Sequence, residues 1–134
     1  MTTDPTLLVL AIQEHLSDDL RREPWKGNPN PLAGHCYVAS ETLWHLLGGR
    51  ASGYTPAFVR WEDSPHWFLR DAGGKILDPT ADQFETLPDY SLGVNKGFLT
   101  RHPSLRSTRL MGRVLAAHPP AEIIPSLEAL RRPA

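Results

Sequence analysis

The sequence is short of cysteine and of long apolar runs. Only one of its 134 residues is a cysteine, Cys36, so no disulfide can form within the chain and nothing points to an oxidising compartment. No stretch approaches the roughly 18 apolar residues of a membrane helix. Acidic residues flank the apolar run 7–12, which is unlike a secretory signal. We therefore expect a cytoplasmic protein with no membrane partner.

The sequence also lacks any strong charge imbalance. Its formal net charge is −1, so we do not expect nucleic acid as a partner. Acidic residues are, however, missing from 95–113, where five basic residues occur, namely Lys96, Arg101, Arg106, Arg109 and Arg113. Helical spacing would place the last three on one face. This face is either simply solvated or a patch for an anionic substrate, to which Lys96, Arg106 and Arg109 would contribute.

Several common ligand-binding motifs are missing. The sequence contains no G-x-x-x-x-G-K-[ST] loop, no C-x-x-C pair and no H-E-x-x-H pair. His35, Cys36, His66 and Asp78 include acceptable zinc ligands, but adjacent residues such as His35 and Cys36 rarely face one ion. We therefore expect neither a metal nor an external cofactor.

Hydrophobic periodicity predicts helices at both ends of the chain and strands between them. Leu8, Ile12, Leu16 and Leu20 recur every four residues, which indicates a helix over 5–21. Further helices are expected from about Gly34 to Leu47, over 103–117 and over 121–132, with strands over 54–61, 66–70 and 75–78. The chain is thus expected to be one α+β domain over 1–134, with N-terminal helices packed on a small antiparallel sheet and a C-terminal helix.

Three residues form the best candidate for chemistry. Cys36 lies at the start of its predicted helix, where free N–H groups and the helix dipole stabilise a thiolate. His66 begins one strand and Asp78 ends the next. A hairpin turn at 71–74 would bring the two together. Asp78 would then orient His66, and the free ring nitrogen would face Cys36 as a base. Asp82 is the rival orienting residue if the strand is shifted.

This order of cysteine, histidine and aspartate resembles the transglutaminase-like and arylamine N-acetyltransferase-like members of the papain-like superfamily. The segments that carry the resemblance are Gly34-His35-Cys36-Tyr37, Pro65-His66-Trp67-Phe68 and Ile76-Leu77-Asp78-Pro79-Thr80. It implies a papain-like fold and acyl transfer at an amide bond of a peptide, protein or small amide through a thioester on Cys36. The chain is shorter than most members, so their substrate lobes are missing.

Other roles follow from the same comparison and stay open. The candidates for stabilising an oxyanion are Asn30, Gln83 and Tyr37. His35 and Trp67 flank the catalytic candidates and are further substrate-binding candidates. The alternative function is a module with the same fold that binds a peptide or protein partner without turnover.

Overall fold

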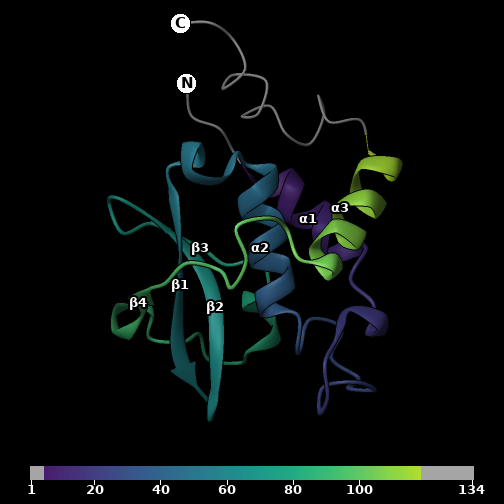
Figure 1. The fold of residues 1–134 in the computed structure, drawn as a ribbon. Coiled ribbons are helices and arrows are strands. Elements are labelled where there is room, and N and C mark those ends of the chain that lie inside the picture. Colours follow the sequence, from purple (N-terminus) through teal and green to yellow (C-terminus); the bar gives the residue numbers. More distant parts are fainter. Residues whose placement is uncertain (1–4, 119–134) are drawn as a thin grey trace, which may run out of the picture.

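The computed structural model describes residues 5–118, which form three α-helices and a four-stranded antiparallel sheet (Figure 1). The expected α+β class is therefore confirmed. In chain order the elements are α1 (Thr6–Glu14), α2 (Cys36–Leu46), β1 (Tyr54–Trp61), β2 (Ser64–Asp71), β3 (Ile76–Leu77), β4 (Val94–Asn95) and α3 (Leu105–Ala117). Within the described residues no helix is long and apolar enough to cross a membrane.

The sheet has the strand order β3-β2-β1-β4, and a long hairpin forms its centre. β1 and β2 pair along their whole length, from Tyr54 opposite Asp71 to Trp61 opposite Ser64. Glu62 and Asp63, which join them, both have positive φ angles, 52° and 64°. A two-residue turn of this kind matches the right-handed twist of the strands. It holds the start of β2, which carries His66, in a fixed register.

The second turn is the one that the sequence predicts. The amide of Gly74 donates to the carbonyl of Asp71 at 3.0 Å, and the Asp71 carboxylate accepts from the amides of Gly73 and Lys75. β3 then pairs with β2, with Leu69 opposite Leu77. Asp78 follows β3 directly, so the chain leaves the sheet beside β2.

α2 is the central helix and lies between the sheet and the α1–α3 pair (Figure 1). Its buried residues Val38, Ala39 and Leu43 pack in one core with residues of the flanking helices, including Leu8 and Leu110. Successive residues of β2 face opposite sides of the sheet, so Leu69 joins this core whereas Phe68 belongs to a second cluster with Ala57 and Val59.

A buried carboxylate ties α2 to the start of α3. Glu41 is fully buried, and its two oxygens accept from the hydroxyl of Ser104 at 2.6 Å and from its amide at 2.9 Å. Ser104 in turn caps α3 by accepting from the amide of Ser107. The carboxylate thus satisfies helix-terminal donors that would otherwise lack partners.

Three sequence expectations need correction or fall outside the structure. α1 ends at Glu14 rather than at residue 21, because Ser17 is extended and Asp18–Leu20 form a separate 3-10 turn that still buries Leu20. The sheet has a fourth strand beyond the three expected, because β4 pairs with β1 through Ala57 and Phe58. The helix expected over 121–132 lies outside the described residues.

Candidate active site

Cys36 is the first residue of α2, and a rigid loop leads up to it. Gly34 has a φ of +78°, and a Cβ placed on it would lie 2.4 Å from the Cβ of Trp25. Glycine is therefore required where the chain passes Trp25 on its way into the helix. The Cys36 side chain is partly exposed, and its thiol donates to the carbonyl of Pro65 at 3.8 Å.

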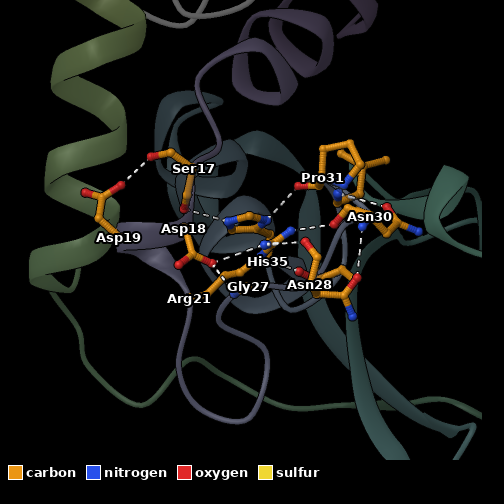
Figure 2. Close-up of polar contacts among 11 residues, drawn as sticks. Ser17, Asp18, Asp19, Arg21, Gly27, Asn28, Asn30, Pro31 and His35 are labelled. Carbon is orange, nitrogen blue, oxygen red and sulfur yellow. Dashed lines mark hydrogen bonds and ion pairs between the residues drawn. The ribbon is translucent and has the colours of Figure 1, made fainter.

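Arg21 and His35 hold this loop by its backbone (Figure 2). The buried guanidinium of Arg21 donates to the carbonyl oxygens of Ala33 at 2.9 Å, of Asn28 at 2.9 Å and of Asn30. The ring nitrogens of His35 lie 2.9 Å from two further carbonyl oxygens, those of Pro31 and Ser17. Burial lowers the pKa of His35. The loop is thus fixed mainly through main-chain acceptors.

His66 and Asp78 form a buried pair at the sheet. Nε2 of His66 lies 2.6 Å from Oδ2 of Asp78, and the two side chains are 3% and 2% exposed. Because this contact occupies Nε2, the nitrogen that remains on the ring is Nδ1. The ring also contacts Phe84 edge to face at 4.8 Å, which restricts its rotation. It is Asp78, and not Asp82, that holds the ring.

The charge state of His66 follows from these contacts. Burial alone lowers the pKa of His66. The hydrogen bonds and charges of Asp78 and Cys36 oppose this effect and raise the pKa to about 9. An imidazolium is therefore the form that the surroundings favour at neutral pH, and Cys36 is one of the two groups that favour it. A cation next to a sulfur stabilises the thiolate.

Asp78 is itself held by donors that the sequence analysis did not identify. The Tyr90 hydroxyl donates to Oδ2 at 2.7 Å, and the Thr80 amide donates to Oδ1 at 3.0 Å. Burial and the adjacent carboxylate raise the pKa of Tyr90 well above its usual value, so the hydroxyl keeps its proton. The Asp78-Pro79-Thr80 sequence could have indicated the Thr80 contact as an Asx turn. Tyr90 follows an irregular segment and carries no such signal.

Cys36 and His66 line one cavity of about 850 Å³. Trp25, Trp61 and Phe84 supply much of its aromatic wall. The buried indole N–H of Trp61 makes no hydrogen bond within residues 5–118. The volume is in the range of small-molecule and peptide sites. Asp78 does not line this space, so it can orient the ring without contacting a ligand.

All three oxyanion candidates line this cavity. The Asn30 amide donates to the carbonyl of Gln83 at 3.2 Å, and the Gln83 amide donates to the Thr80 hydroxyl at 3.0 Å. Each amide nitrogen carries a second hydrogen that it can donate. Tyr37 accepts from the amide of Leu99 at 2.8 Å through its hydroxyl oxygen. The first-turn amides of α2 are further donors, because they have no partner within the helix.

The substrate-binding candidates divide into two groups. Trp67 and Arg106 line the cavity, and the Trp67 ring also packs against those of Tyr37 and Phe98. The other three lie elsewhere. His35 is buried below the loop, Lys96 lies over the ring of Phe58, and Arg109 pairs with Asp19 at 3.3 Å. None of these three lines the cavity, so they are not positioned to bind a substrate there.

Arg22 is a cavity residue that the sequence analysis missed. It lines the same space as Arg106, and its positive charge helps to lower the pKa of Arg106, after the larger effect of burial. Within residues 5–118 neither arginine has an acidic partner in an ion pair. The two arginines thus bring positive charge to a cavity wall that also carries the carboxylates of Glu23 and Glu62. Arg22 precedes a turn-rich loop, and no sequence pattern links it to Arg106.

Searches with this sequence and structure find no matching protein-family model, no matching curated protein and no matching solved structure.

Proposed function

We propose that the chain is a thiol-dependent acyl-transfer enzyme in which Cys36, His66 and Asp78 act as nucleophile, acid–base group and orienting carboxylate. The observation that supports this most directly is that Cys36 and His66 line the same cavity, while Asp78 binds the far nitrogen of the ring at 2.6 Å. The arrangement of a cysteine-initiated helix against an antiparallel sheet that carries the histidine also fits the papain-like resemblance.

The proposed reaction begins with the Cys36 sulfur attacking the carbonyl carbon of an amide. The oxygen becomes negatively charged and is stabilised by donors at the cavity wall, including the first-turn amides of α2. The C–N bond then breaks, and the proton of the His66 imidazolium passes to the leaving amine. A thioester remains on Cys36. Water or a second amine, deprotonated by the now neutral ring, releases the acyl group and regenerates the thiol site.

The selectivity of such a site would come from the cavity wall. Trp25 and Trp61 offer flat apolar surfaces, and Arg22 and Arg106 offer positive charge. These features favour a peptide or small amide that carries an acidic group near the scissile bond. No external cofactor is needed for any of these steps.

Alkylation of the single thiol tests the proposal directly. Iodoacetamide at pH 7 should modify Cys36 at least about tenfold faster than an unperturbed thiol, because the His66 cation stabilises the thiolate. His66→Ala should abolish most of this advantage. His102→Ala, which removes an exposed histidine, is the matched control and should leave the rate unchanged. Slow alkylation that does not depend on His66 would overturn the proposal and favour a binding module.

A further inference from the structure

Glu14, His15 and His118 form a cluster of potential metal ligands far from the Cys36 cavity. Glu14 is the last residue of α1 and His15 follows it, whereas His118 follows α3. One ligand atom from each residue lies within 4.8 Å of those of the other two. Nε2 of His118 is 3.4 Å from Oε2 of Glu14. Residues 103 positions apart in the sequence thus converge where two helices end.

Two imidazole nitrogens of this cluster are buried without a hydrogen bond. Nε2 of His15 and Nε2 of His118 are both shielded from solvent, and neither makes a hydrogen bond within residues 5–118. The rings meet edge to face, with centroids 5.7 Å apart. Buried polar atoms are nearly always paired with protein, water or an ion. Two buried nitrogens that lack a hydrogen bond and lie next to a carboxylate are therefore a donor set suited to a metal cation.

The electrostatic surroundings favour a cation at this position. The C-terminal ends of α1 and α3 each carry partial negative charge from the helix dipole, and Glu14 adds a carboxylate. The opposing charge is that of Arg113, whose guanidinium donates to the carbonyl of His15 at 3.4 Å. Arg113 is itself bound by the Asp19 carboxylate at 2.5 Å, so its charge is largely compensated.

We propose that Glu14, His15 and His118 bind a divalent transition metal such as Zn²⁺, with water completing the coordination. Two imidazoles and one carboxylate are a common zinc ligand set. Ligand atoms around a tetrahedral zinc ion lie about 3.3 Å apart. Side-chain rotations that move the ligand atoms by roughly 1 Å would bring the three residues to this spacing. The metal would join the ends of α1 and α3 and so stabilise the packing of the helical layer.

Zinc titration of the full chain carrying Cys36→Ser tests this proposal, because that substitution removes the one thiol, which could bind zinc at the proposed active site. Calorimetry at pH 7.5 should show one saturable site, and Zn²⁺ should raise the melting temperature relative to the protein in EDTA. His15→Ala and His118→Ala should each weaken binding by about tenfold or more. His102→Ala, at an exposed histidine outside the cluster, should bind zinc as before.

A substitution of Glu14, the exposed residue of the cluster, separates a loss of zinc binding from a loss of folding. The Glu14 side chain is 63% exposed, so Glu14→Gln should leave the fold intact while it weakens zinc binding. Absence of a saturable site in the Cys36→Ser protein would overturn the proposal. Zinc binding that survives both His15→Ala and Glu14→Gln unchanged would overturn it as well.

Discussion

The Tyr90 hydroxyl donates a 2.7 Å hydrogen bond to Oδ2 of Asp78, the same oxygen that accepts from the His66 ring. Tyr90 comes from the segment between β3 and β4, and its ring packs edge to face on Phe68 at 4.9 Å. The carboxylate is therefore fixed from two sides before it orients the histidine. Positioning of this kind locks a ring into one orientation and one tautomer.

Removing this hydroxyl should destabilise the fold measurably. Tyr90→Phe keeps the contact with Phe68 but deprives a buried carboxylate of a donor, which typically costs about 1–2 kcal/mol of unfolding free energy. Urea denaturation would measure the change. Tyr54→Phe is the matched control, since the Tyr54 hydroxyl makes no hydrogen bond within the described part of the chain. Equal midpoints for the two variants would contradict the expectation.

The pKa of His66 should depend on Asp78. In the wild type it is about 9, because the carboxylate and Cys36 outweigh the effect of burial. In Asp78→Asn no carboxylate offsets the effect of burial, so the pKa of His66 should fall substantially. An NMR titration of the imidazole signals would follow it. Asp82→Asn changes an exposed carboxylate and should leave the pKa of His66 where it is.

The same shift predicts how stability changes with pH. The folded-state pKa of His66 lies above the ordinary value of 6.5, so the protonated ring favours the folded state. This contribution is fully present below pH 6.5 and is lost as the pH rises through about 9. The unfolding free energy should therefore fall across this interval in the wild type and fall less in Asp78→Asn. A wild-type profile that is flat from pH 6.5 to 9 would contradict the prediction.

Gly34 should tolerate alanine much less well than Gly27. Both glycines have a left-handed φ, +78° and +83°, but a Cβ on Gly34 would collide with Trp25 whereas Gly27 has nothing within 4 Å. Gly27→Ala should cost only the roughly 1–2 kcal/mol of the left-handed backbone. Gly34→Ala should cost clearly more and should also slow alkylation of Cys36, since the loop positions that residue. Denaturation midpoints and alkylation rates measured together would check both effects.

The two arginines of the cavity wall should favour anionic reagents. Arg22 and Arg106 line the space around Cys36 without acidic partners among residues 5–118. The ratio of the iodoacetate rate to the iodoacetamide rate should therefore fall roughly fivefold in Arg22→Ala and Arg106→Ala, which corresponds to about 1 kcal/mol of Coulomb energy. Arg109→Ala is the control because Arg109 pairs with Asp19 outside the cavity. A ratio that stays constant in all three variants would argue against an anionic substrate.

Local signals in the sequence predicted the parts of the site that depend on short-range structure. The start of α2 at Cys36 and the turn between Asp71 and Gly74 are marked by their own residues, and the turn brings His66 near Asp78. The turn at Glu62 and Asp63 carries no such mark. Its two positive φ angles are those usually supplied by Asn-Gly, and here the paired strands impose them.

What the sequence could not predict depends on contacts between distant segments. Helical periodicity continued past Glu14, but the 3-10 turn is held instead by Asp19, which binds Arg109 and Arg113 of α3. β4 has only two residues and too little pattern to be detected. The cluster of Glu14, His15 and His118 forms only when α1 and α3 pack together, so no spacing in the sequence reveals it.

The way Arg21 is bonded has a consequence for how this cavity could evolve. Its guanidinium contacts the main-chain oxygens of Asn28, Asn30 and Ala33, and every amino acid at those positions would present the same oxygens. Substitutions there would keep these three contacts, although they would remove the bonds that the Asn28 and Asn30 side chains accept from loop amides. Ala33, whose contact with Arg21 is through its main chain, is the position where a new ligand preference could arise with least effect on the thiol.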